Sequence, residues 1–562
     1  MSNQNTQNSP VEPPEQEGQS APNLPDQQNP QDADTTPANI TVDLTKNPLA
    51  LRDLFDDFVY ESFQMERQDS GLKVTYVYKL GSFTFRPVLQ INADKITNLD
   101  LNLAFLRNLF FNFGLVNAIN YYKLTLAPNF VVHAGPLDAY QQHFFRKVFY
   151  HGLGEMMFRN HIQLSFADFM HFKSDPSDQA IARLKDPQSQ YANFYHLRPT
   201  TNLRKANHDS RTQTSPSPSN QASPDPTAPP IPDGVLPFDL GHNFHGNLIP
   251  IGGGKDSIVT LESLHSMYED NLCFLFNRNI YPENQAALDC IKYAGYPVNK
   301  IASVDLSFDP LLFELNKAGY YNGHVPFSAL LAFASLISAY LNNKAYIVLS
   351  NEASANEGNV KGSDINHQYS KSFAFESDFQ DYVKHYLTDQ IYYFSLLRCL
   401  NEYQIMQKFL QYPTYLNLFR SCNVGTRENK WCGHCAKCLY VAIMLYPFVS
   451  VGQIKQIFGH DPLDDPSLFD TFVSLYNPDT TKPFDCVGTR DEINYSLTLA
   501  LIRLHRTLTP DFHFPVLLKF YEEKIYDPHR DYSQVEHFFN PKHHIPPQFL
   551  ALITNDGATK PS

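Results

Sequence analysis

Residue types that bind anions are concentrated in one segment, 248–257, whose sequence is LIPIGGGKDS. Its first half is apolar, and Ile258 and Leu261 follow it at helical spacing, so the pattern predicts a strand, a glycine turn and the start of a helix. Glycines let backbone N–H groups approach a ligand closely, and a helix N-terminus adds unpaired donors and a positive dipole end. Lys255 adds a point charge and Ser257 a hydroxyl. The segment is therefore a candidate phosphate site.

The residue order in this turn is not that of the Walker A loop, which has four residues between its first glycine and Gly-Lys-Ser/Thr. Gly253-Gly254-Lys255-Asp256-Ser257 instead resembles the PP-loop of the ATP pyrophosphatase superfamily, whose members split ATP into AMP and pyrophosphate. Gly252 stands where that motif has its first serine, so this hydroxyl is missing here. The alternative is a tight turn between strand and helix that binds no ligand.

Four of the eight cysteines fall in one short segment with the spacing C-x9-C-x2-C-x2-C: Cys422, Cys432, Cys435 and Cys438. Thiolates suit tetrahedral Zn²⁺, and Cys-x-x-Cys lets two of them reach one metal from a tight turn. Four sulfur ligands leave no open position, so we expect a structural zinc site that stabilises the fold. An iron–sulfur cluster uses the same ligands and is the main alternative. Free or redox-active thiols are the remaining one.

A densely polar stretch follows a predicted strand end and holds Asn351, Glu352, Asn366, His367, Tyr369, Lys371 and Glu376. So many different donors and acceptors in one loop indicate a substrate or nucleotide contact. For His367, Tyr369 and Lys371 a structural role is as plausible as a catalytic one. A solvated loop is the alternative for the whole stretch.

The elements that would position these residues form an α/β pattern. Strands are predicted at 248–251, 272–276, 300–304 and 346–350, with helices at 256–268, 283–294 and 326–340 between them. This alternation implies a parallel sheet with helices on both faces, in which ligands bind beyond the carboxyl ends of the strands. The glycine turn and Asn351-Glu352 would then face one crevice.

Composition divides the remaining chain. We expect a hairpin at 73–85 and helices at 101–113 and 137–149 in an N-terminal α+β domain, and a mostly helical C-terminal region. The polar, proline-rich N-terminus and a Pro/Ser-rich stretch should be disordered. The predicted parts are 1–42 (tail), 43–204 (N-terminal domain), 205–234 (insertion), 235–458 (ATP-binding domain with the four cysteines) and 459–562 (helical region).

Charge and hydropathy exclude some classes of protein. The net charge of −14 argues against broad binding to nucleic-acid phosphates. The most apolar run, 325–341, is just short of a comfortable membrane span and lies within the α/β pattern, so we predict a buried helix and no membrane partner. No apolar signal segment is visible at the N-terminus, and we expect a cytoplasmic protein.

Several motifs together resemble the UDP-N-acetyl-α-D-muramoyl-L-alanyl-L-glutamate epimerase family. They are GGGKDS at 252–257, NEASAN at 351–356, NHQYSKS at 366–372, CGHCAKC at 432–438 and KPFDCVGT at 482–489, and GLGE at 152–155 also fits. The resemblance covers about 47–500. It implies a PP-loop (HUP-like) fold and an isomerase that uses ATP and Mg²⁺ to invert the terminal L-Glu of a UDP-linked muramoyl dipeptide in peptidoglycan precursor synthesis. Adenylation of the carboxylate would acidify the Cα proton, and AMP and pyrophosphate would be released.

This resemblance assigns provisional roles to the residues. The expected ATP contacts are Gly252, Gly253, Gly254, Lys255, Asp256, Ser257 and Asn351. The catalytic candidates are His367, Lys371, Glu352 and Cys486, and the substrate contacts are Tyr369, Asn366 and Glu376. Cys486 is a possible second acid or base, with a buried inert thiol as the alternative. Two other functions stay open: a PP-loop enzyme acting on a nucleobase precursor, as 7-cyano-7-deazaguanine synthases do, and a nucleotide-binding protein without turnover.

Overall fold

The computed structural model describes residues 42–69, 71–92, 103–174, 196–197, 225, 227–231, 235–241, 243–276, 285–363, 365–425, 428–507 and 512–554. The predicted N-terminal tail, and all but a few residues of the predicted insertion at 205–234, lie outside these residues.

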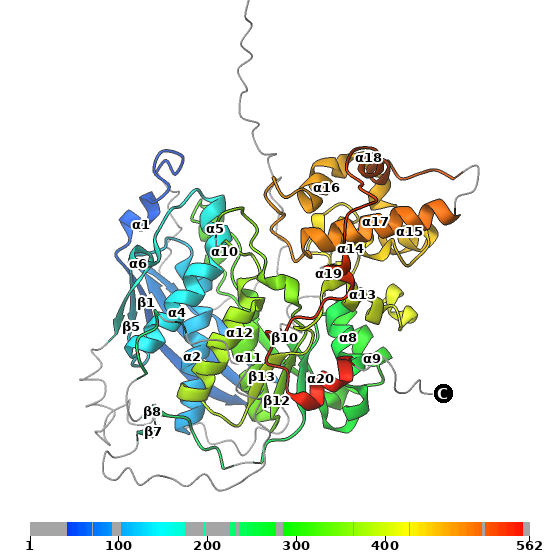
Figure 1. Cartoon of the computed structure of the whole chain (residues 1–562). Coiled ribbons are helices and arrows are strands. Elements are labelled where there is room, and N and C mark those ends of the chain that lie inside the picture. Colours follow the sequence, from blue (N-terminus) through cyan, green and yellow to red (C-terminus); the bar gives the residue numbers. More distant parts are fainter. Residues whose placement is uncertain are drawn as a thin grey trace, which may run out of the picture. The chain divides into compact units, whose positions relative to one another are not determined.

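The fold is mixed α/β and is built on one 11-stranded sheet (Figure 1). The strands are β1 Asp57–Gln68, β2 Gly71–Leu80, β3 Phe83–Phe85, β4 Val88–Asn92, β5 Asn129–Val132, β6 His171–Ser174, β9 Asn247–Pro250, β10 Asn271–Phe276, β11 Ile301–Ser307, β12 Tyr346–Leu349 and β13 Tyr392–Ser395. The short strands β7 His196–Leu197 and β8 Val235–Leu236 pair separately.

Five strands form the parallel part of the sheet, in the order β13-β12-β9-β10-β11. The chain runs outward from β9 through β10 to β11 and then crosses back to place β12 on the other side of β9. In such sheets the loops that leave the two strands at this reversal diverge and open a crevice. The glycine turn follows β9 and Asn351 follows β12, so the predicted crevice lies at the reversal.

The antiparallel part continues directly from β11. Strand β4 pairs antiparallel with β11 and with β2, and β2 pairs with β1 and β3. The predicted hairpin is confirmed as β2 and β3, and β2 alternates buried and half-buried side chains as a sheet with one covered face requires. The division at 204/235 stays a prediction, but the sheet and one hydrophobic core cross it without interruption.

Helices cover the sheet and form a C-terminal group. Those before and within the parallel part are α1 Ala50–Leu54, α2 Ala104–Asn117, α3 Ile119–Tyr122, α4 Ala139–Gly152, α5 Gly154–Arg159, α6 Phe166–Phe169, α8 Lys255–Ser263, α9 Gln285–Tyr293, α10 Leu311–Lys317, α11 Phe327–Leu341 and α12 Phe373–Tyr386. Those after it are α13 Glu402–Phe409, α14 Ala436–Leu445, α15 Val451–Phe458, α16 Phe469–Tyr476, α17 Arg490–Thr507, α18 Val516–Lys524, α19 Ser533–Glu536 and α20 Pro547–Thr554.

The apolar run at 325–341 is helix α11, which packs beside α2 against the sheet (Figure 1). Most of its side chains are buried, so the prediction of a buried helix is confirmed. Among the described residues, no helix is both long enough and apolar enough to cross a membrane.

Helices α13 to α19 contribute to a second hydrophobic core, which also includes side chains of α8, α9 and α20 and of strands β9, β10, β12 and β13. Asn401 begins α13 with a capping box to Gln404, and Ser450 begins α15 with one to Gln453, which satisfies the free N–H groups of each first turn. The last helix returns to the sheet, where the Phe549 ring lies 5.0 Å from those of Tyr346 and Phe394. The prediction of a mostly helical C-terminal region is confirmed.

Candidate active site

The glycine turn joins β9 to α8 and lies against α9 and the segment just before Cys422. Gly253 has a φ of +80°, and a Cβ there would lie 2.8 Å from the backbone nitrogen of Ala287. Its carbonyl accepts a hydrogen bond of 2.8 Å from the N–H of Arg420. Gly252 differs, because a Cβ at this position would meet nothing within 4 Å. The turn is therefore packed on one side and open on the other, as a ligand-binding turn requires.

Lys255 does not extend into this open space. Its ammonium group is buried and pairs with the carboxylates of Asp256 and Glu402. Burial opposes its charge, but the two carboxylates outweigh that effect and raise its pKa. The charge expected to meet a phosphate is thus already balanced within the protein. The hydroxyl of Ser257 likewise turns back, donating to the carbonyl of Gly254 at 2.9 Å.

A second buried carboxylate lies behind Glu402. Glu492 accepts the backbone N–H of Glu402 at 2.9 Å, and its other oxygen accepts that of Thr489. Burial and the negative charge of Glu402 raise the pKa of Glu492 to about 7. The hydroxyl of Tyr440 is buried beside the pair, and its burial, together with the negative charges of Glu402 and Glu492, raises its pKa. Acidic groups are therefore concentrated directly behind the glycine turn.

The loop after β12 lies across from these acidic residues, because the strand order of the sheet reverses between β9 and β12. Asn351 donates to the hydroxyl of Ser395 at 3.0 Å, and Glu352 is buried. Lys371 lies within electrostatic reach of Glu352 and Asp256, and both carboxylates help to raise its pKa. The structure thus brings Asn351 and Glu352 to the same edge as the glycine turn, as the strand pattern predicted.

Cys486 lies in a second polar cluster, with Lys371 and His367. Its Sγ lies 3.1 Å from the Nζ of Lys371, and His367 hydrogen-bonds to the same sulfur. Burial disfavours the thiolate, but the Lys371 ammonium and the His367 hydrogen bond outweigh it and lower the pKa of Cys486 to about 6. The residue is partly exposed, so a ligand can reach it. A reactive thiolate is therefore favoured over an inert buried thiol.

His367 is in turn oriented by a carboxylate from the N-terminal half of the chain. Its Nδ1 pairs with Glu155, the second residue of α5. Burial disfavours the imidazolium, but the hydrogen bonds to Cys486 and Glu155 raise the pKa of His367 to about 9. Glu155 is 6% exposed in its side chain and is also held by Arg159 at 2.7 Å. Carboxylate, imidazole and thiol thus form a connected chain of acid–base groups.

His324 completes this cluster from the loop before α11. Its ring centroid lies 4.1 Å from that of His367, and its Nδ1 lies 4.0 Å from Glu155. Burial and the neighbouring His367 lower its pKa to about 3, so it stays neutral. Glu155, His324 and His367 also have the spacing of a metal-ligand set, although the first and last are already bonded to each other.

The three residues predicted to contact substrate pack against other parts of the protein, Glu376 and Tyr369 in buried and Asn366 in half-buried positions. Glu376 is paired with the fully buried Arg398 at 3.0 Å, and Asn366 donates to the carbonyl of Ala355 at 2.9 Å. The ring of Tyr369 is buried and lies 4.9 Å from that of His151. The polar groups of Glu376 and Asn366 bond to other parts of the protein, whereas the buried hydroxyl of Tyr369 has no hydrogen-bond partner among the described residues. A role of the three in substrate binding stays a prediction.

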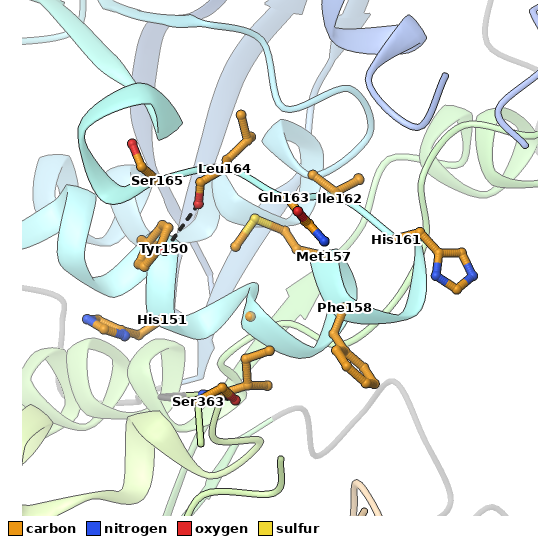
Figure 2. A pocket seen from close by; sticks show the side chains of 12 residues that line it. Tyr150, His151, Met157, Phe158, His161, Ile162, Gln163, Leu164, Ser165 and Ser363 are labelled. Atoms are coloured by element: carbon orange, nitrogen blue, oxygen red, sulfur yellow. Dashed lines mark hydrogen bonds between the residues drawn. The ribbon is translucent and has the colours of Figure 1, made fainter. Parts of the chain in front are cut away.

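An open cavity of about 600 Å³ is lined by the end of α4, by α5, by the segment that follows α5 and by Ser363 and Ile365 (Figure 2). Its lining is mixed, with Tyr150, Met157 and Leu164 as apolar walls and two histidines, His151 and His161, as polar groups. Gly154 borders it and precedes Glu155. The cavity is thus next to the acid–base cluster.

The four predicted metal ligands converge. The sulfurs of Cys422 and Cys435 are 3.8 Å apart, those of Cys432 and Cys438 are 3.7 Å apart, and all four lie within 4.8 Å of one another. A tetrahedral zinc ion with Zn–S bonds of about 2.3 Å requires sulfurs about 3.8 Å apart. Backbone N–H groups of Gly425 and Cys432 also donate to the sulfur of Cys422. The cluster fits a four-sulfur metal site.

Comparison with known proteins places this site in a family. The family model described as "MurL N-terminal domain" matches residues 50–192 and 222–396, and "MurL C-terminal domain" matches 418–510. The chain belongs to the UDP-N-acetyl-α-D-muramoyl-L-alanyl-L-glutamate epimerase family. The resemblance inferred from the motifs is confirmed.

Three curated members of this epimerase family illustrate the relationship, and each carries the family's full name. The protein of Xanthomonas oryzae is 30% identical over 66% of this chain and 70% of its own length. Those of Salinispora tropica and Micromonospora are 35% and 34% identical over 48% of this chain, and the matches span 59% and 61% of those proteins. No solved structure matches this chain.

Sequence reasoning assigned no role to five members of the site: Glu155, His324, Glu402, Lys437 and Glu492. The GLGE motif pointed to Glu155 only through its resemblance to the epimerase family. Lys437 lies between two of the cysteines, and its ammonium donates to the carbonyl of Cys486. The position of Lys437 between two predicted metal ligands does not indicate that its side chain extends to Cys486.

Proposed function

We propose that this protein inverts the terminal L-Glu of a UDP-N-acetylmuramoyl-L-Ala-L-Glu precursor after activating its carboxylate with ATP. The single observation that carries the proposal is the connected chain of Glu155, His367 and Cys486 beside the Lys371 ammonium. Such a group holds a thiolate at neutral pH, and a thiolate is a base suited to a carbon acid. Membership of the epimerase family supplies the substrate class.

The first step of the proposal uses the glycine turn. The glutamate carboxylate attacks the α-phosphorus of ATP, pyrophosphate leaves, and an acyl adenylate remains. The open face of Gly252 and the N-terminus of α8 offer backbone N–H groups to phosphate oxygens. The turn follows β9, where the order of the parallel strands reverses, and this position supports its assignment to a ligand.

Mg²⁺ is the cofactor that this step requires in the proposal. Asp256, Glu352 and Glu402 would be the carboxylates that hold it, with Lys255 as the present partner of Asp256 and Glu402, and Mg²⁺ prefers oxygen ligands. When bound, the ion would neutralise charge that develops on the phosphates. The four-cysteine cluster is proposed to hold a structural Zn²⁺.

The second step uses the acid–base cluster. The mixed anhydride carries no carboxylate charge next to Cα, so its Cα–H is more acidic than that of free glutamate. The Cys486 thiolate takes this proton. Before the transfer, the positive charges of Lys371 and His367 stabilise the thiolate. A proton delivered to the opposite face inverts the centre, and water then releases AMP.

Two measurements report the two steps separately: exchange of pyrophosphate into ATP reports adenylation, and deuterium incorporation at Cα reports proton transfer. The wild-type protein, incubated in D₂O with ATP, Mg²⁺ and the UDP-linked dipeptide, should form AMP and a D-Glu product with deuterium at Cα. Cys486→Ala should retain exchange of labelled pyrophosphate into ATP but lose roughly 10²–10⁴-fold in deuterium incorporation.

A matched control is Cys290→Ala, which removes a buried thiol of α9 outside the cluster and should leave both rates near those of the wild type. Absence of AMP with the wild-type protein would reject adenylation. Undiminished deuterium incorporation by Cys486→Ala would reject the thiolate as the base.

A further inference from the structure

We propose that His434, His460 and Asp465 form a second metal site, which binds a divalent transition-metal ion and is separate from the four cysteines. The Nδ1 of His434 lies 3.1 Å from an Oδ2 oxygen of Asp465, and the Nε2 of His460 lies 3.7 Å from the same oxygen. All three ligand atoms lie within 4.8 Å of one another. Two imidazole nitrogens and one carboxylate oxygen are a ligand set that Zn²⁺, Co²⁺ and Ni²⁺ accept.

The three residues come from two parts of the fold. His434 lies in the turn between Cys432 and Cys435, and His460 follows Gly459, whose φ of +83° ends helix α15. Asp465 lies between two short 3-10 helices, Pro462–Asp464 and Pro466–Leu468. Two backbone segments, the cysteine turn at 432–435 and the stretch at 459–466, therefore bring their ligand atoms together.

The Asp465 carboxylate is oriented as a metal ligand requires. Its Oδ1 accepts the backbone N–H of Ser467 at 2.9 Å and the Ser467 hydroxyl at 2.7 Å. This leaves Oδ2 directed at the two imidazole rings. Hydrogen bonds that hold the outer oxygen of a ligating carboxylate are a recurrent feature of metal sites.

His460 supplies an independent observation. Its Nε2 is buried and has no hydrogen-bond partner among the described residues. Its distance of 3.7 Å from Asp465 is too long for a hydrogen bond. A buried polar atom without a partner costs free energy, and a metal ion between the three ligands would supply the missing partner.

The site depends on the neighbouring cysteine turn. Gly433 has a φ of +79°, and a Cβ there would lie 2.3 Å from the Cε1 of His460. The imidazole ring thus packs directly on the backbone between Cys432 and His434, and the two histidine rings stack with centroids 4.5 Å apart. Because His434 is 63% exposed, water can fill the remaining metal positions. The second ion would be exchangeable, whereas the four-sulfur site is closed.

Metal stoichiometry tests the proposal without reference to catalysis. The full-length protein, purified with its cysteine site loaded and treated with a mild chelator, would be titrated with Co²⁺ and with Zn²⁺. Bound metal would be measured by elemental analysis, and Co²⁺ by its visible spectrum. We expect one additional equivalent per chain, with weak d–d bands and without the intense sulfur-to-cobalt charge transfer of a thiolate site.

Variants locate the additional ion. His460→Asn and Asp465→Asn should weaken its binding by at least about 100-fold while the tightly held equivalent remains. His513→Asn is the matched control, because His513 pairs with the adjacent carboxylate of Asp464 at 2.8 Å but lies outside the three-ligand group. No additional equivalent in the wild type, or one that both variants retain, would overturn the proposal.

Discussion

The ammonium of Lys371 lies 3.1 Å from the sulfur of Cys486, although 115 residues separate them along the chain. The contact joins the loop after β12 to the segment before α17, and it places a permanent positive charge beside a thiol whose pKa falls to about 6. The charge of Lys371 should therefore control the pH at which the thiolate forms.

Lys371→Met tests this electrostatic link. Loss of the ammonium should raise the pKa of Cys486, so the acidic limb of the pH profile for Cα deuteration should move from about pH 6 upward by at least about one unit. Lys371→Arg keeps the charge and should move the limb less. An unmoved limb in Lys371→Met would show that another group titrates there.

Glu155→Gln tests the role of the carboxylate behind His367. The imidazolium loses its partner, so the pKa of His367 should fall from about 9 and the alkaline limb of the profile should move to lower pH. A charged hydrogen bond of this kind is worth roughly 1.5–3 kcal/mol, which predicts a 10- to 150-fold loss in deuteration rate. Arg159→Gln removes a more exposed partner of Glu155 and is the control, with a small effect on both limbs.

Gly252 and Gly253 form a matched pair for the ATP site. Gly253→Ala places a side chain at φ +80° and against the backbone of Ala287, so it should destabilise the fold by at least about 1–2 kcal/mol. Gly252→Ala meets no protein atom and should leave the melting temperature unchanged. If phosphate occupies the open face, Gly252→Ala should nevertheless raise the KM for ATP in pyrophosphate exchange. An unchanged KM would place the nucleotide elsewhere.

Glu376→Gln distinguishes a framework role from substrate binding. It would leave the Arg398 guanidinium buried without its carboxylate, so unfolding by denaturant should show a loss of about 3–5 kcal/mol. Asp479→Asn breaks an exposed pair with Lys361 and should leave the denaturant midpoint nearly unchanged. A stable Glu376→Gln protein with a raised KM for the dipeptide would instead support the substrate contact.

Glu492 should make stability depend on pH. Its pKa is raised to about 7 in the folded protein, so between pH 4.5 and 7 the unfolded chain releases a proton that the folded protein retains. The free energy of unfolding should therefore fall by about 3 kcal/mol as pH rises through this window. Glu492→Gln should flatten the slope, measured by urea unfolding at several pH values. Glu523→Gln, an exposed position of α18, should keep it.

The parts of the fold that local patterns determine were predictable. Strands β9, β10, β11 and β12 and helices α8, α9 and α11 follow from apolar runs, glycine turns and helical periodicity, each within a short window, whereas α10 between β11 and β12 was not predicted. Strand β4 could not be paired with β11 in the same way, because that pairing joins residues far apart and reverses the strand direction. Nothing local marks which strand edge another strand will cover.

The candidate site shows the same limit. The motif at 366–372 identified His367 and Lys371 as candidates, but their effect on Cys486 depends on a contact that only the folded chain creates. Lys255 shows the opposite case. Its place after three glycines predicted a free charge for phosphate, whereas Glu402, far along the chain, pairs with it. Residue type indicates possible chemistry, and tertiary partners decide which charges remain available.

The antiparallel pairing of β4 with β11 also has a consequence during synthesis on the ribosome. Strands β1, β2 and β4 are synthesised early. Strand β11, which pairs with the free edge of β4, is synthesised about 200 residues later, and this interval takes roughly 10–40 s at ordinary translation rates. During that interval the edge of Val88–Asn92 exposes unpaired N–H and C=O groups that could pair with another nascent chain. Slowed translation between these strands should therefore increase aggregation, and a chaperone that shields this edge should reduce it.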